Sequence, residues 1–406
     1  MNAPPEFFAA YPVITSRFAR ATTGQRMWIE WIEVLSDKTR IVHERKFSQA
    51  AILPVVVALA LFLTGRVGEA REFAGGKIEL FFGPQEYGAE NSLEEELIGF
   101  INQAKESLDI SVQELDSEAI AQAILNASRR EKASNPEQKL NIRIILEESY
   151  QLDEMYEENR QIYMELLRAG IRARLDYNSK IMHDKFIIRD YNREDEAVWL
   201  GSANFTTTGT HANYNNAVVI RNHEIAKAYM DEFREQWSGQ FGKRFDETPA
   251  AQPVDIGGIS VQPLFAPDNN PENAIVDLIN DASRSIRFMI FTFSQSSQID
   301  DAILAKLGQD ISVCGIFDKI QAKQQWTPDN NLLQNGAKIR WDSMPGKLHH
   351  KLLILDDETV VLGSLNFTKP ANEENDENIV IIKDTRIASY VTEEFKRIWA
   401  QSDTSE

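Results

Sequence analysis

Two short segments of the sequence place a histidine and a lysine two residues apart. His183 precedes Lys185 and His349 precedes Lys351, and each pair lies ahead of a Gly-Ser-x-Asn-Phe-Thr segment. An imidazole titrates near neutral pH, so it can act as a nucleophile or a general acid, while an ammonium group can neutralise charge that builds in a transition state. In a β-strand, residues i and i+2 point to the same face, so each His and Lys would project together from a rigid element.

A single His-x-Lys segment would be explained most simply as part of a surface strand. Here the residues that follow each lysine, 186–188 and 352–354, are apolar and can anchor the strand in a core. Because the whole pattern occurs twice, a functional site is favoured over two unrelated surface strands.

The pattern is doubled because the chain contains an internal repeat. Residues from Ile78 resemble those from Ile259, and residues 201–216 align without a gap with residues 363–378. Each copy alternates strand and helix patterns, which predicts two α/β units of similar fold. The predicted organisation is a leader at 1–46, a hydrophobic segment at 47–70, a first domain at 78–243, a linker at 244–258 and a second domain at 259–400.

The N-terminal region contains an apolar run, Ala50 to Leu63, that follows Arg45 and Lys46. The run is shorter than the roughly 20 residues of a comfortable membrane span. Gly68 and Ala70 form a small-x-small cleavage pattern, although the leader before the run is long for a signal peptide. We expect export to a periplasmic or secreted location, or membrane anchoring through residues 47–66; a buried core helix is the remaining alternative.

Composition restricts the partners of the protein. There are 62 acidic and 43 basic residues, a formal net charge of -19, so the molecule repels polyanions unless basic residues gather at one site. The single cysteine rules out an intramolecular disulfide.

The two motifs also carry a resemblance to a known family. Asp190 and Asp356 complete two HxK(x4)D segments, and these, with the two Gly-Ser-x-Asn segments, resemble the signature of the phospholipase D superfamily. The resemblance covers residues 78–400. It implies an α/β fold with two similar sandwich domains, each a mixed sheet flanked by helices, which pack as a pseudo-twofold dimer around one shared active site. The residues that it implies for this site are His183, Lys185, Ser202, Asn204, His349, Lys351, Ser364 and Asn366.

The chemistry implied by the family is attack on a phosphodiester. One neutral imidazole attacks phosphorus, and a second, protonated imidazole donates to the leaving oxygen; water or another alcohol then attacks the phosphohistidine. The lysines and the asparagine amides would bind the non-bridging oxygens, and Gly201, Ser202, Gly363 and Ser364 would let the turns approach the phosphate. No metal or other cofactor is expected for this mechanism.

One asymmetry between the repeats bears on the roles of the two histidines. Asn215 in the first copy aligns with Glu377 in the second. The resemblance implies that this position holds the ring nitrogen that faces away from the substrate, and a carboxylate there favours the imidazolium. If each residue pairs within its own half, His349 is the better initial acid and His183 the better nucleophile.

The remaining polar residues near the motifs are assigned simpler roles. We expect Asp190 and Asp356 to fix the ends of their strands, and His350 to face away from His349. His211 is a candidate for the rim of the pocket.

The substrate is expected to be a phospholipid whose head-group phosphodiester is cleaved at a membrane by a monomer with an internal pseudo-dimer. The alternative is a metal-independent endonuclease of the same superfamily acting on DNA or RNA; a cardiolipin-synthase-like transferase and a non-catalytic scaffold are also considered. A lipid site needs apolar loops near its mouth, for which Trp326, Met344 and Pro345 are candidates. A nucleic-acid site needs a basic groove, for which the nearby candidates are only Lys319, Lys323 and Lys369.

Overall fold

The computed structural model describes residues 71–242, 250–309 and 311–404. The predicted leader, the hydrophobic segment and part of the predicted linker lie outside these residues. Val254–Ile256, within the predicted linker, form strand β9. No helix in the described part of the chain is long and apolar enough to cross a membrane.

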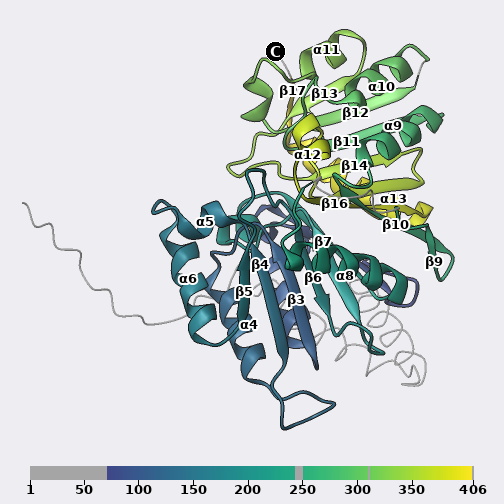
Figure 1. Cartoon of the computed structure of the whole chain (residues 1–406). Helices are drawn as coiled ribbons and strands as arrows, with labels where there is room; N and C mark the ends of the chain where they lie inside the picture. Colours follow the sequence, from purple (N-terminus) through teal and green to yellow (C-terminus); the bar gives the residue numbers. More distant parts are fainter. Residues whose placement is uncertain (1–70, 243–249, 310, 405–406) are drawn as a thin grey trace, which may run out of the picture. The chain divides into compact units, whose positions relative to one another are not determined.

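The first half of the chain forms an eight-stranded mixed sheet in the order β1-β2-β8-β7-β6-β3-β4-β5 (Figure 1). Strands β3, β4 and β5 run parallel, and β6 pairs antiparallel with β3. The strands are β1 (Glu72–Phe73), β2 (Ile78–Gly83), β3 (Ser107–Val112), β4 (Asn141–Leu146), β5 (Arg172–Leu175), β6 (Lys185–Arg189), β7 (Ala197–Gly201) and β8 (Asn215–Ile220).

The second half repeats this arrangement in a nine-stranded sheet, β17-β13-β12-β11-β14-β15-β16-β10-β9. Its parallel strands are β11, β12 and β13, and β14 pairs antiparallel with β11 just as β6 pairs with β3. The further strands are β10 (Ile259–Ala266), β11 (Ser285–Ile290), β12 (Ser312–Phe317), β13 (Lys338–Trp341), β14 (Lys351–Leu355), β15 (Thr359–Gly363), β16 (Glu377–Lys383) and β17 (Asp403–Thr404).

Eleven α-helices and two short 3-10 helices lie in the described residues. In the first half they are η1 (Gln85–Tyr87), α3 (Leu93–Asn102), α4 (Glu118–Arg129), α5 (Glu148–Leu152), α6 (Glu157–Arg168), α7 (Thr207–His211) and α8 (His223–Ser238). In the second half they are α9 (Pro271–Asp281), α10 (Gln298–Leu307), η2 (Gln321–Lys323), α11 (Asp329–Gln334), α12 (Lys369–Glu373) and α13 (Thr385–Gln401).

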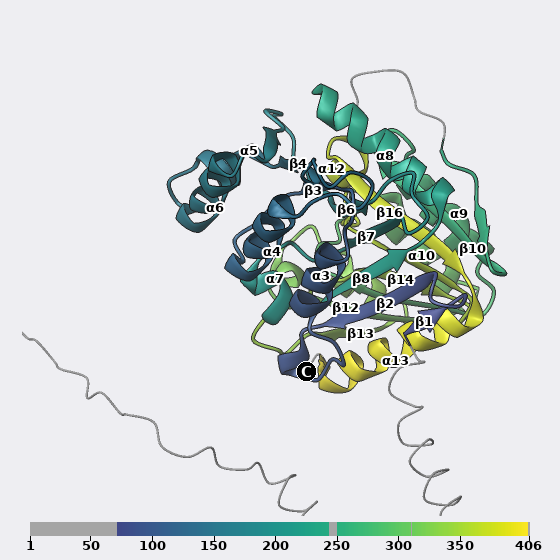
Figure 2. The ribbon, with the colours of Figure 1, turned by 90° about the horizontal axis from the view of Figure 1, so that it is seen from below.

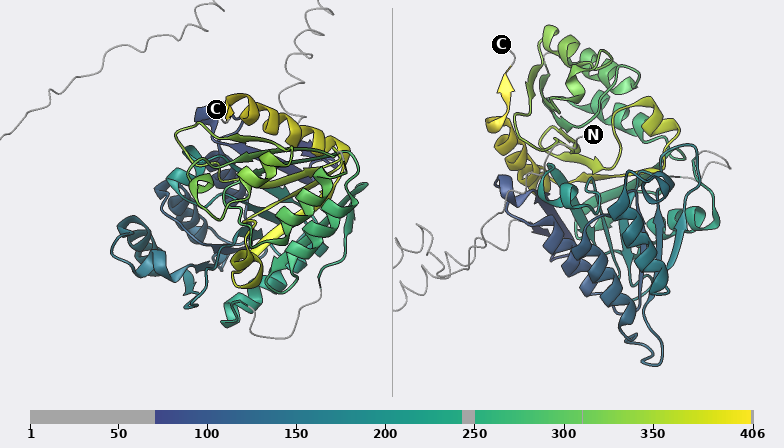
Figure 3. Two further views of the ribbon diagram at one scale, coloured as in Figure 1. Left: turned by 90° about the horizontal axis from the view of Figure 1, so that it is seen from above. Right: turned by 90° about the vertical axis from the view of Figure 1, so that its left-hand side faces the viewer.

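Each sheet buries both faces, because successive side chains of a strand point in opposite directions. In β6, Ile187 enters a core shared with α3, α4 and α6, whereas Phe186 and Ile188 enter a second core. That second core also contains Leu352 and Ile354 of β14, together with residues of α8 and α13. The two halves therefore share one apolar core. Figure 3 shows the ribbons of the two halves packed against each other. The predicted fold class, two similar α/β domains with mixed sheets flanked by helices, is confirmed.

Asp190 and Asp356 each stabilise the end of a motif strand, as expected. Both have positive φ, 53° and 55°, and both lie in buried or half-buried turns after β6 and β14. The Asp190 carboxylate accepts hydrogen bonds from the backbone N–H groups of residues 105–107, at 2.7 to 3.0 Å. The Asp356 carboxylate accepts from those of residues 283–285, at 2.7 to 2.8 Å. The signature aspartates thus tie each motif strand to the loop that precedes β3 or β11.

We predict that Asp190→Ala lowers the free energy of unfolding by about 2–4 kcal/mol, because three backbone donors would lose their acceptor. Asp195→Ala, which removes only a surface ion pair with Lys105, should cost less than about 1 kcal/mol. Urea unfolding followed by circular dichroism measures both. Equal losses in the two variants would contradict this role of Asp190.

Candidate active site

The backbone segments that lead into the two motif strands pair across the halves. The N–H of His183 donates to the Asp376 carbonyl at 2.9 Å, and the N–H of His349 donates to the Tyr214 carbonyl at 2.9 Å. In the reverse direction, the N–H of Asp376 donates to the Ile181 carbonyl and the N–H of Tyr214 donates to the Lys347 carbonyl. His183 is therefore positioned by the segment that leads into β16, and His349 by the segment that leads into β8.

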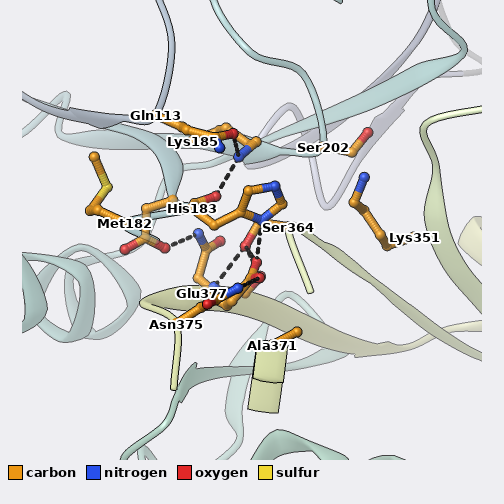
Figure 4. Close-up of polar contacts among 12 residues, drawn as sticks. Gln113, Met182, His183, Lys185, Ser202, Lys351, Ser364, Ala371, Asn375 and Glu377 are labelled. Atoms are coloured by element: carbon orange, nitrogen blue, oxygen red, sulfur yellow. Dashed lines mark hydrogen bonds and ion pairs between the residues drawn. The ribbon is translucent and has the colours of Figure 1, made fainter. Parts of the chain in front are cut away.

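His183 is held by a carboxylate from the second half. Its Nδ1 lies 2.6 Å from Oε2 of Glu377, which also accepts a hydrogen bond from the Ser364 hydroxyl at 2.7 Å, and Asn375 donates to the other carboxylate oxygen (Figure 4). A carboxylate oxygen only accepts, so Nδ1 carries a proton and Nε2 of the neutral ring keeps its lone pair. Burial raises the pKa of Glu377 to about 7.

His349 is held by an amide from the first half. Its Nδ1 lies 2.9 Å from Oδ1 of Asn215 and 3.2 Å from the Ser202 carbonyl oxygen. The Asn215 amide nitrogen donates to the Gly209 carbonyl, which fixes the orientation of that amide with its oxygen toward the ring. His349 therefore also carries its proton on Nδ1 when neutral, with Nε2 free.

These contacts correct one expectation from the sequence. Pairing within each half is wrong, because Glu377 contacts His183 and Asn215 contacts His349. The strand pattern indicates which face a side chain occupies, but the partner is decided by how the two sheets meet. The carboxylate of the second half therefore does not favour an imidazolium on His349, because it contacts His183.

The two lysines are buried together with the histidines. Nζ of Lys185 donates to the His183 carbonyl and, at 3.1 Å, to Gln113; Nζ of Lys351 donates to the His349 carbonyl at 2.8 Å. Burial lowers the pKa of Lys185 to about 8, and burial together with Lys185 lowers that of Lys351 well below its usual value. Two buried ammonium groups whose bonds go mainly to neutral oxygens form a site that favours an anion.

Burial, together with the two lysines, also lowers the pKa of both histidines. The pKa of His183 and that of His349 each lie well below the ordinary value, so both rings are neutral in the free protein at pH 7. A neutral ring with a free Nε2 is the form that can attack an electrophile.

The Gly-Ser-x-Asn turns close the site against β8 and β16. A Cβ on Gly201 would lie 2.2 Å from the Asn216 carbonyl oxygen, and one on Gly363 would lie 2.2 Å from that of Asn378. The adjacent serines are fully buried and bond to the histidine partners: Ser202 to Asn215 and Ser364 to Glu377. In this structure the serine hydroxyls thus orient the residues that hold the histidines.

The middle residues of the two His-x-Lys segments face away from the site and join the halves. Asp184 accepts from the Asn378 amide at 2.6 Å, and His350 contacts the Asn216 amide at 3.0 Å. His350 is fully buried, which matches the expectation that it faces away from His349. His211 lies in α7 and contacts Glu86 and Glu94 rather than any of the predicted site residues.

Three residues that line the site were missed by the sequence reasoning. Gln113 and Glu114 follow β3 and accept hydrogen bonds from the Asn204 amide at 3.4 and 3.1 Å. In the second half the residue equivalent to Gln113 is Phe291. The centroid of its ring lies 4.8 Å from that of the His349 ring and 5.1 Å from Nζ of Lys351. In the sequence, these residues could have been found as the ones that directly follow the apolar runs of β3 and β11. The site is therefore more polar on its first-half side.

One group of carboxylates could approach a cation, although the sequence predicted no metal site. Oxygens of Glu232, Glu235 and Asp268 lie within 4.8 Å of one another. They come from α8 and the loop before α9, and none of the hydrogen bonds or ion pairs above links them to the histidines and lysines.

Both repeats of the chain match one known protein family. A family model described as "Cardiolipin synthase, PLD-like domain" matches residues 97–237 and 275–399, more than half of the chain and both repeats. The chain belongs to the phospholipase D superfamily. The prediction made from the two motifs is confirmed.

Curated relatives of this phospholipase D family protein align with about one third of its length. It is 34% identical over 141 residues to the mitochondrial cardiolipin hydrolase of Xenopus laevis, across 35% of this chain and 66% of that protein. It is 31% identical over 144 residues to the phospholipase D of Rickettsia prowazekii, across 35% of this chain and 70% of that protein. The solved phosphatidylserine synthase of Haemophilus influenzae shares the fold, with a TM-score of 0.62 and 16% identity over 81% of this chain and 87% of that chain.

We predict that Glu377→Gln alters His183 and leaves His349 unchanged. Replacing the carboxylate by an amide weakens a charge-assisted hydrogen bond, so the Nδ1 proton of His183 should move upfield in histidine-selective ¹H–¹⁵N NMR. Asn215→Ala is the matched variant and should affect only the His349 signal. A shift of the His349 signal in Glu377→Gln would instead indicate that Glu377 pairs with His349, within its own half.

Proposed function

We propose that the protein cleaves the head-group phosphodiester of a glycerophospholipid through a phosphohistidine intermediate. The observation that carries this proposal is the convergence of two histidines, each with a free Nε2, and two buried lysines from opposite halves of one chain. The names of the curated relatives, cardiolipin hydrolase and phospholipase D, support it.

In the proposed mechanism, His183 is the nucleophile. Its Nε2 attacks phosphorus while Glu377 accepts the hydrogen bond from Nδ1–H. The carboxylate stabilises the positive charge that the ring acquires when the N–P bond forms. Lys185 and Lys351 neutralise the non-bridging oxygens. Asn366 is a further proposed amide donor, and the Asn204 amide, which donates to Gln113 and Glu114 in this structure, would have to exchange these bonds for the phosphate. The phosphohistidine is thus placed on the ring that has a carboxylate partner.

His349 is the proposed general acid. Its Nδ1 stays bonded to Asn215, so Nε2 must carry the proton that passes to the leaving alcohol oxygen. After the head group leaves, the same Nε2 accepts a proton from water, which attacks phosphorus and restores free His183. Because His349 is neutral in the free protein, the proton must be taken up as the negatively charged substrate binds.

The surroundings of the site favour a lipid over a nucleic acid. Of the basic candidates, Lys319 donates to the Met344 carbonyl at 2.6 Å, and Lys369 lies 3.7 Å from Glu373. Both lysines thus have partners within the protein, whereas Lys323, the third candidate, is exposed. These contacts weaken the case for a basic groove. Trp326, the apolar candidate near the mouth, is 40% exposed.

We also propose that the protein is exported or anchored through residues 47–66, which would bring this site to a membrane.

The decisive assay is turnover by the purified full-length protein in EDTA. We expect head-group release from vesicles of phosphatidylcholine, phosphatidylglycerol or cardiolipin, lowered by at least about a thousandfold in His183→Ala. The matched control, His211→Ala, should keep activity within about threefold because His211 contacts no site residue. Cleavage of single- or double-stranded DNA without lipid turnover would establish the nuclease alternative instead.

The pH dependence should differ between kcat/KM and kcat. The free enzyme must gain a proton on His349, whose pKa is lowered, so kcat/KM should fall as pH rises through neutrality. In the bound complex the phosphate charge raises that pKa, and the fall in kcat should lie at higher pH. A further loss is expected above about pH 8, where Lys185 loses its charge. Superimposable profiles for kcat and kcat/KM would contradict the proposed proton uptake.

A further inference from the structure

The exposed large apolar side chains of the described residues are unevenly distributed. Six of the eight follow strands β4, β5 and β12, and the other two, Met164 and Leu167, lie on α6. The six are Leu152, Met155, Tyr177, Ile181, Ile320 and Trp326. These strand ends are the ones that face the active site, because β6, which begins at Lys185, pairs antiparallel with the end of β3. Isolated exposed apolar residues are ordinary, but their gathering at one edge marks an interaction surface.

Four of these residues form what we call the apolar rim: Leu152, Met155, Tyr177 and Ile181. The segments that carry them are joined at the site itself. The N–H of Glu148, the first residue of α5, donates to Asp176 at 2.7 Å, and the N–H of Met182 donates to Glu147 at 2.7 Å. Met182 directly precedes His183, so the apolar rim is continuous with the catalytic strand. Figure 2 shows α5 and α6 at the edge of the first half.

The rim is highly exposed, and the charged residues on either side of Met155 are acidic. Basic residues also lie close to the rim: Lys180, which precedes Ile181, pairs with Glu374, and Arg160 and Arg168 line a pocket together with Leu152. Met155 is 74% exposed and Tyr177 66% exposed. Next to Met155, the side chains of Asp153, Glu154 and Glu157 are also exposed. Carboxylates disfavour an anionic surface but complement ammonium groups, which choline and ethanolamine head groups present outermost on a bilayer.

We propose that the apolar rim inserts into a zwitterionic phospholipid bilayer and holds the active-site mouth against it. Leu152 and Met155 enter the acyl boundary, while the neighbouring carboxylates contact head-group ammonium groups. This deepens the proposed function and rests on its phospholipid substrate. Docking through apolar insertion also makes binding insensitive to salt, in contrast to a basic patch.

The test places an environment-sensitive fluorophore on the full-length protein, through Met155→Cys in a Cys314→Ser background. Phosphatidylcholine vesicles should shift its emission to the blue, and brominated acyl chains should quench it. Neither effect should be reversed by 0.5 M NaCl, which shortens the Debye length to roughly 4 Å. A fluorophore at Glu137→Cys, on the loop before β4 at the opposite end of the strands, is the matched control and should not respond. No shift at position 155, or a shift only with anionic vesicles at low salt, would overturn the proposal.

A kinetic measurement separates docking from chemistry. The double variant Leu152→Asp and Met155→Asp should turn over phosphatidylcholine vesicles about tenfold or more slowly, because two apolar groups no longer insert. Its rate on monomeric dihexanoyl phosphatidylcholine should stay within about twofold of the parent protein. Equal losses on both substrates would contradict a docking role. Absence of turnover by the parent protein on phosphatidylcholine, phosphatidylglycerol and cardiolipin alike would refute the proposed function, while the fluorescence result would still decide the docking.

Discussion

The bond from His183 to Glu377 crosses the contact between the two halves, and the arrangement of the whole site depends on this exchange. Glu377 is buried at the start of β16, and its other bonds, to Ser364 and Asn375, hold it within the second half. The His349–Asn215 contact is the mirrored exchange. Each half therefore supplies one histidine and the group that orients the other half's histidine. A site built this way exists only when the halves are joined, which the shared apolar core ensures.

The contact between the two halves also buries Lys185 and Lys351 together in the site, largely away from water. Lys185 is fully buried and Lys351 is 2% exposed, and like charges held together in a low dielectric disfavour their own protonated states. A phosphodiester relieves this by supplying negative charge. The repulsion between the two lysines in the free protein is thus replaced by attraction to the substrate, which favours binding and stabilises the transition state. Glu377 supplies partial compensation, since Lys185 and Lys351 both lower its pKa against the stronger effect of burial.

Much of this could be predicted from the sequence, because the repeat doubles every signal. Alternating apolar residues around His183 and His349 predicted the motif strands, and the constant spacing to Gly201 and Gly363 predicted equivalent turns. The crossed pairing of Glu377 could not be predicted, since strand periodicity specifies the face of a side chain but not which sheet lies opposite. Phe291 escaped notice for a related reason: its proximity to His349 arises from strand pairing between β11 and β14, segments far apart in the chain.

In the proposed mechanism His183, whose ring is held by Glu377, forms the covalent bond to phosphorus. The most direct measurement is rapid quenching of the full-length protein during turnover of a ³²P-labelled short-chain phospholipid, followed by alkaline digestion and mass spectrometry. We expect an acid-labile phosphorus adduct on the peptide that contains His183, lost in His183→Ala and formed more slowly in Glu377→Gln. An adduct on His349 instead, or turnover with no adduct on either histidine, would contradict it.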